Sequence, residues 1–122
     1  MNKDRFEQLV AEAVEALPEE FQARLENVDV VVEDLPTRRQ MGRLERGMTL
    51  LGLYEGVPLT ERYSSYGMVA PDKITIFQRT IESQCGGDES EIKEEIQRVV
   101  RHEIAHHFGI GDARLDQIER GE

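Results

Sequence analysis

The sequence predicts an α+β fold, and three observations support this prediction. A pattern with helical spacing opens the chain, three short segments rich in β-branched or apolar residues follow, and a second helical pattern of about twenty residues ends near residue 108. At 122 residues the chain can bury one modest hydrophobic core, and a pair of domains does not fit. We therefore expect a single domain over residues 1–122, without an internal repeat or linker.

The first 35 residues are predicted to form two helices and a strand. Apolar residues at spacings of three and four indicate an amphipathic helix over residues 3–17. Pro18 ends this helix and suits the first position of a short second one. The β-branched residues of 28–33 then indicate a strand, which we expect at the centre of the sheet.

The middle of the chain is predicted to be strands joined by longer connections. Residues 37–47 carry four arginines and are interpreted as a solvated connection rather than a binding patch. Residues 49–56 indicate an edge strand, in which Gly52 marks a bulge or a close approach of another backbone. A loop over residues 57–71 is long enough to be functional. A third strand over 74–77 and a turn of helix over 78–84 follow.

The last long helix is predicted to begin after Asp88, which can accept hydrogen bonds from the first free backbone amides. Its core face is defined by five residues: Ile92, Ile96, Val99, Val100 and Ile104. On a helical wheel Glu103 falls near the middle of this apolar face. A carboxylate there costs several kcal/mol unless a charge or a hydrogen bond compensates it. We therefore expect Glu103 to have a partner.

Composition narrows the classes of partner. Lys and Arg number 15 against 25 Asp and Glu, so the formal net charge is -10. This charge opposes binding to nucleic acid or to an anionic membrane surface and favours peptides or basic partners. The single cysteine, Cys85, excludes an internal disulfide and is interpreted as an ordinary or part-buried thiol. No apolar run is long enough for a membrane span, and the expected location is cytoplasmic.

The most specific motif is His102-Glu103-x-x-His106 on the long helix. Histidines four residues apart lie on one face of a helix, about one turn from each other, and can converge on one metal ion. Glu103 between them supplies a general base. Gly109 can end the helix, and Asp112 follows where the returning chain could offer a third ligand, leaving the fourth position to water. This arrangement is typical of a catalytic zinc site.

Alternatives remain open for several residues. Asp112 also suits the N-cap of a final short helix, and it can serve both purposes. His107 is interpreted as a core histidine or as a donor to a metal ligand, rather than as a ligand itself. Tyr54, Tyr63 and Tyr66 are candidates to donate a hydrogen bond to an oxyanion, although packing or a surface position is the favoured interpretation for each.

Zn²⁺ is the predicted metal. Two imidazoles and a carboxylate suit zinc, and a catalytic zinc site keeps one position open for water. The same donors can hold Fe(II) in the arrangement of two histidines and one carboxylate, but the internal base Glu103 favours zinc. Metal affinity is expected to fall at acid pH as the histidines protonate.

The chain resembles the small bacterial minimal-zincin metallopeptidase family. The resemblance rests on His102-Glu103-x-x-His106-x-x-Gly109-x-x-Asp112, with Leu-Tyr-Glu-Gly at 53–56 and Pro71-Asp72 as supporting features. It covers about residues 5–118. It implies a minimal zincin-like fold: a small mixed sheet of three to four strands packed on N-terminal helices and a long C-terminal active-site helix. It also implies His102, His106 and Asp112 as metal ligands and Glu103 as base.

Three hypotheses about function follow. The leading one is a zinc metallopeptidase that cleaves peptide or amide bonds with a zinc-activated water and Glu103 as general base. Its peptide or protein substrate would pair with the edge strand near residues 49–54. The second is a zinc-binding protein-interaction domain with weak or no catalysis. The third is a structural helix without metal. The sequence names neither the substrate nor the oligomeric state.

Overall fold

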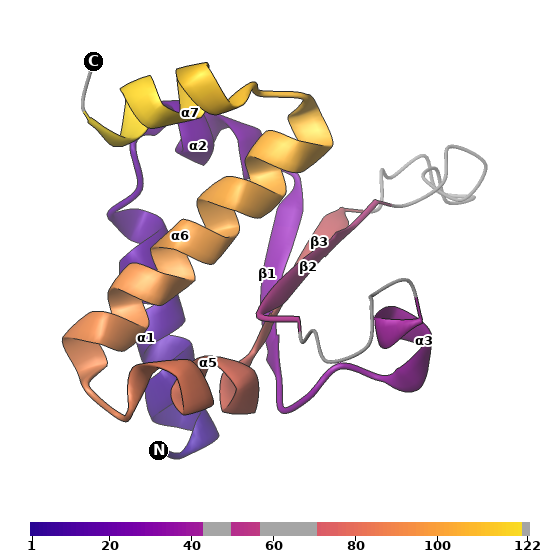
Figure 1. The fold of residues 1–122 in the computed structure, drawn as a ribbon, viewed down its shortest axis with the longest axis vertical. Coiled ribbons are helices and arrows are strands. Elements are labelled where there is room, and N and C mark those ends of the chain that lie inside the picture. The colour runs from indigo at the N-terminus through magenta and orange to yellow at the C-terminus, as the bar shows by residue number, and fades with distance from the viewer. Residues whose placement is uncertain (43–49, 57–70, 121–122) are drawn as a thin grey trace.

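The computed structural model describes residues 1–42, 50–56 and 71–120, and within these ranges it leaves out the side chains of Asp112, Asp116 and Glu119. Along the chain the helices and strands are α1 (Lys3–Glu15), α2 (Glu19–Arg24), β1 (Val28–Glu33), α3 (Arg38–Met41), β2 (Gly52–Glu55), β3 (Asp72–Phe77), α5 (Gln78–Cys85), α6 (Glu89–Phe108) and α7 (Asp112–Glu119). The mixed α+β fold with a long C-terminal helix agrees with the prediction (Figure 1).

The described strands form one mixed sheet in the order β1-β3-β2. β1 runs parallel to β3, and β2 runs antiparallel to it. The prediction that residues 28–33 form the central strand is therefore wrong, because β3 is central. The density of β-branched residues in β1 reflects one face packed on helices, and Asp29 and Glu33 on the other face are exposed. β2 is an edge strand, as predicted.

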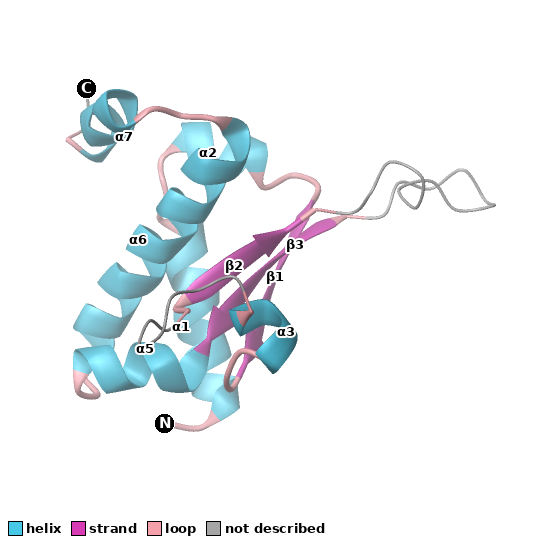
Figure 2. Cartoon of the chain, turned by 45° about the vertical axis from the view of Figure 1, so that its right-hand side comes forward, coloured by secondary structure: helices cyan, strands magenta, loops and turns pink. Residues whose placement is uncertain are grey.

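The helices α1, α5 and α6 gather on one side of the sheet, away from the short helix α3 (Figure 2). α6 contacts α1, α5 and β2, so it lies at the middle of the core. The predicted core face of α6 is confirmed by the five residues that are all buried: Ile92, Ile96, Val99, Val100 and Ile104. On α1 the buried residues are Phe6, Leu9, Val10 and Ala13, which confirms its predicted amphipathic face.

Connections were predicted with mixed success. Residues 78–84 do form a helix, α5, which starts at Gln78. The basic segment contains the short helix α3, whose Thr37 cap accepts from Gln40 N–H, and Arg38 and Arg39 are exposed as expected. Most of the predicted functional loop over 57–71 lies outside the described residues. None of the described helices is both long and apolar enough to cross a lipid bilayer.

Gly52 allows β2 to lie directly against α6. A Cβ atom at this position would stand 2.5 Å from Cγ1 of Val99 and 3.2 Å from the carbonyl oxygen of Thr75. The first distance is far below van der Waals contact, so no larger side chain fits without a shift of strand or helix. The prediction for Gly52 is confirmed in part: an element does approach closely, but the nearest atom belongs to the Val99 side chain of α6, and the nearest backbone atom is the oxygen of Thr75.

We expect Gly52→Ala to lower the free energy of unfolding by about 1–3 kcal/mol, the usual cost of overpacking a core. Urea denaturation followed by circular dichroism measures this loss. Gly42→Ala is the matched control, because its added Cβ would meet only backbone oxygens at 3.4 Å and 3.6 Å. Equal stability of Gly52→Ala and the unchanged protein would contradict the close packing of β2 against α6 at this position.

Candidate metal centre

The candidate site lies on the last two turns of α6. This helix begins at Asp88, whose side chain accepts from the N–H groups of Ser90 and Glu91. It ends at Gly109, which adopts a left-handed conformation with φ of 70° and donates its N–H to the carbonyl of Ala105. Both predicted ends of the helix are confirmed. His102 and His106 therefore stand four residues apart on a continuous helix, as the motif requires.

Glu103 points from α6 toward β2 and is half-buried. Its Oε1 atom accepts a hydrogen bond of 2.8 Å from the backbone N–H of Tyr54. This contact confirms the expectation that a carboxylate on the core side of the helix needs a partner, and the partner is a backbone amide of the edge strand. His102 and His106, on either side of it, are exposed to solvent.

Opposing effects act on the pKa of the Glu103 carboxyl. Burial raises its pKa above the ordinary value, because removal from water disfavours the charged form. The hydrogen bond from Tyr54 and the charges of His106 and His102 lower the pKa, but they only partly offset burial. A carboxylate whose pKa is raised by burial is a stronger base than one in water, which is the property a general base needs.

Two small pockets border the motif. The first has a volume of ≈ 270 Å³ and is lined by Leu53, Tyr54, Glu103, His106 and His107. The second has a volume of ≈ 190 Å³ and is lined by His102, Glu103, Ala105, His106, Ile110 and Leu115. Glu103 and His106 line both pockets, so a ligand can approach these two residues from two sides.

Asp112, the predicted third ligand, is the first residue of α7, which confirms the final short helix. Its side chain is not among those described, so its role as ligand or cap stays a prediction. Within the described side chains, no three His, Cys, Asp or Glu residues form a group that could hold a metal ion. The donors that are described, two imidazoles a turn apart beside a carboxylate, are of the types zinc prefers.

Tyr54 is the centre of a cluster that the sequence did not predict. Its hydroxyl donates to Oδ2 of Asp72 at 2.6 Å, and Asp72 is buried, with 6% of the residue exposed. Its ring stacks on His107 with centroids 3.9 Å apart. Phe108 meets both rings edge-on, and the guanidinium of Arg24 lies 5.5 Å from the centre of the Phe108 ring.

This cluster decides between alternatives left open by the sequence. His107 is exposed and stacked on Tyr54, so its interpretation as a core histidine is wrong. The hydroxyl of Tyr54 is directed to Asp72, which agrees with packing as its favoured role. Tyr63 and Tyr66 lie outside the described residues. Cys85 is half-buried, and burial raises the pKa of its thiol, which agrees with an ordinary structural cysteine.

The comparisons with known proteins assign the family. The family model described as zincin-like metallopeptidase matches residues 25–122, more than half of the chain. The chain therefore belongs to the zincin-like metallopeptidase family, as the sequence motif predicted. No curated protein matches the chain.

A solved structure supports the fold. The chain is similar to a conserved hypothetical protein from Thermo thermophilus, with 24% sequence identity and a TM-score of 0.56. The match covers 88% of this chain and 94% of that one. At this identity the similarity concerns the fold alone.

We expect Tyr54→Phe to lower the free energy of unfolding by about 1.5–3 kcal/mol, the usual worth of a hydrogen bond to a charged group. The substitution removes the hydroxyl that Asp72 accepts from and keeps the ring that stacks on His107. Chemical denaturation measures the change. In an Asp72→Ala background the same substitution should cost far less, and an equal cost in both backgrounds would contradict the coupling.

Proposed function

We propose that this protein is a zinc-dependent metallopeptidase that hydrolyses peptide or amide bonds. His102, His106 and Asp112 would hold the metal, and Glu103 would act as general base. The observation that carries the proposal is the half-buried Glu103 carboxylate, held by the Tyr54 N–H between two histidines one turn apart. Membership of the zincin-like metallopeptidase family supports the same conclusion.

When bound, zinc would supply a water molecule whose pKa is lowered toward about 7. The protein's own contribution is to fix the base. One oxygen of Glu103 accepts from Tyr54, which holds the carboxylate on the β2 side of α6 and leaves its second oxygen to take a proton. Burial raises the pKa of this carboxyl, so a proton accepted there is held more firmly than on an exposed glutamate and can be passed to a leaving amine.

The proposed substrate is a peptide or protein segment that lies along β2. Phe77 N–H donates to the carbonyl of Leu51. In an antiparallel ladder such pairs alternate, so the backbone N–H and C=O groups of Leu51 and Leu53 face β3. The backbone groups of Gly52 and Tyr54 consequently face the outer edge, where the Tyr54 N–H is bonded to Glu103 and the Gly52 groups and the Tyr54 carbonyl remain for a peptide. An extended peptide paired with this edge would lie beside Glu103, as in recognition by strand addition.

A zinc-binding interaction domain with little catalysis is the second candidate. It is favoured by the size of the two pockets beside Glu103, ≈ 270 Å³ and ≈ 190 Å³. These volumes lie below the range of roughly 300–1,000 Å³ that is usual for sites enclosing a small ligand. Such pockets hold a substrate side chain weakly, so efficient cleavage would depend on pairing along β2.

Zinc binding is tested first. We expect about one zinc per chain at neutral pH and a loss of affinity below pH 6 as the histidines protonate. His102→Gln, His106→Gln and Asp112→Asn should each weaken zinc binding strongly, measured by competition with a chelating dye. His107→Gln is the matched control and should bind zinc like the unchanged protein. If the purified protein contains no zinc and binds none when it is added, only the hypothesis of a structural helix without metal would remain.

Catalysis is tested separately with a peptide library analysed by mass spectrometry. We expect the zinc-loaded protein to cleave peptides and Glu103→Gln to lower kcat by about 10²–10⁴-fold, the usual contribution of a general base. Gln keeps an oxygen that can accept from Tyr54, so zinc content should not change. Equal turnover by both proteins would exclude Glu103 as base, and zinc binding without turnover would favour the interaction domain.

A further inference from the structure

We propose that the outer edge of β1, with the groove between β1 and α1, binds an extended segment of another protein that carries alternating apolar and basic side chains. The segment would add to the sheet as an antiparallel strand next to β1. This surface is on the opposite edge of the sheet from β2, and the proposal does not depend on zinc or on peptidase activity.

The backbone of β1 offers hydrogen-bonding groups at this edge. Asp72 N–H donates to the carbonyl of Asn27, and in a parallel ladder such contacts alternate along the strand. Asp29, Val31 and Glu33 therefore turn their amide groups toward β3. The N–H and C=O groups of Val30 and Val32 face the outer edge, where no other strand among the described residues pairs with them.

Proteins usually protect such an edge with charged side chains, proline, a bulge or a covering element, and on β1 the charged side chains are Asp29 and Glu33. β1 has six consecutive register partners on β3, from Val28 to Glu33, so no bulge interrupts it, and it contains no proline. A strand of six residues spans about 20 Å, enough for five or six residues of an added segment.

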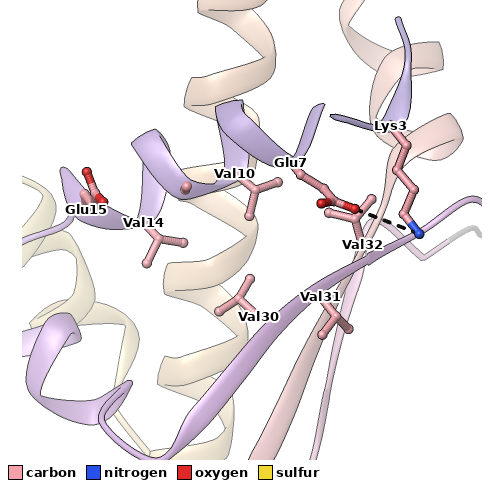
Figure 3. A pocket seen from close by; sticks show the side chains of 9 residues that line it. Lys3, Glu7, Val10, Val14, Glu15, Val30, Val31 and Val32 are labelled. Atoms are coloured by element: carbon pink, nitrogen blue, oxygen red, sulfur yellow. Dashed lines mark ion pairs between the residues drawn. The ribbon is translucent and has the colours of Figure 1, made fainter. Parts of the chain in front are cut away.

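An apolar groove of ≈ 560 Å³ runs beside this edge (Figure 3). Val30 and Val32 point from β1 toward Val10 and Val14 of α1, and Val31 points the other way. Every second side chain of an added strand would enter this groove and meet valines, so apolar side chains are required at those positions.

The charges around the groove select a basic segment. Glu7 and Glu15 stand near its two ends, and Glu7 forms an ion pair of 3.9 Å with Lys3 (Figure 3). On the other face of β1, Asp29 and Glu33 are exposed. The register places Lys73 between Asp29 and Glu55, so this row of the sheet carries one basic and two acidic residues and its net charge is negative.

The same charges oppose a second copy of this chain. In an antiparallel pairing of two β1 strands centred on Val31, Asp29 of each copy would stand opposite Glu33 of the other. Like charges directly opposite each other destabilise a sheet, and each copy carries a net charge of -10. The occupant we infer therefore has Lys or Arg opposite Asp29 and Glu33, with apolar residues opposite Val30 and Val32.

The probe is a capped peptide with the central sequence Lys-Val-Thr-Val-Lys, labelled for fluorescence anisotropy. We expect saturable binding and slower hydrogen exchange of the Val30 and Val32 amides, measured by NMR, when the peptide is bound. A peptide with Glu in place of both Lys should bind about tenfold more weakly, as two cross-strand pairs change from attraction to repulsion. No saturable binding of the lysine peptide, or unchanged exchange at both valines, would overturn the proposal.

A charge exchange in the protein provides the second test. Asp29→Lys with Glu33→Lys should reverse the preference, so that the glutamate peptide binds more tightly than the lysine peptide. The control, Glu19→Lys with Glu94→Lys, makes the same change in net charge at exposed residues away from β1 and should keep the original preference. If both double variants lost affinity for the lysine peptide equally, binding would depend on net charge alone, and the proposal would be overturned. A dimer with protected Val30 and Val32 amides in the absence of peptide would assign the edge to a second copy and also overturn it.

Discussion

The hydrogen bond from the Tyr54 N–H to Glu103 is the interaction on which the site depends, because it joins the edge of the sheet to the long helix. It forms only where strand and helix approach closely, and Gly52 makes this possible at Val99. Gly52 and Tyr54 are two residues apart on a strand, about 6.8 Å, and Val99 and Glu103 are four apart on a helix, about 6 Å. Because these two spacings are similar, the close contact of Gly52 with Val99 places Tyr54 next to Glu103.

A consequence is that the two edges of the sheet differ. At β2 one outward amide is already used by Glu103, so a peptide added there would find Gly52 and the Tyr54 carbonyl but not the Tyr54 N–H. At β1 the backbone groups of Val30 and Val32 face the outer edge, and their side chains line a groove formed with α1. The β2 edge thus has outward backbone groups beside the Glu103 carboxylate, whereas the β1 edge has them beside an apolar groove and exposed acidic side chains.

The features that were predictable from the sequence are those encoded by local periodicity. The apolar spacing along α6 located its buried face, and from that face came the expectation that Glu103 needs a partner, which the Tyr54 amide meets. The ends of α6 followed from Asp88 and Gly109, whose side-chain chemistry and backbone freedom act within one turn. These signals need no knowledge of the rest of the fold.

Features that depend on strand pairing were not predictable in this way. The central position of β3 was missed because β1 has more valines, yet β-branched density reports a packed face and not two hydrogen-bonded edges. Asp72 was not identified as the partner of Tyr54, since the two are 18 residues apart and meet only through the antiparallel register of β2 and β3. The stacking of His107 on Tyr54 was missed for the same reason, because it depends on how β2 packs against α6.

The position of the motif on α6 also bears on the charge of its ligand. His102 and His106 lie in the last two turns of the helix, where the aligned peptide dipoles give a partial negative charge of about half an electron at the C-terminus. Glu103 adds a carboxylate whose pKa burial raises, so the ionised form lacks sufficient compensation from the amide of Tyr54 alone. With a net charge of -10 on the whole chain, each of these contributions to the local field favours a cation. The half-buried carboxylate and the C-terminal end of the helix therefore act in the same direction, and the local field beside His102 and His106 attracts positive charge.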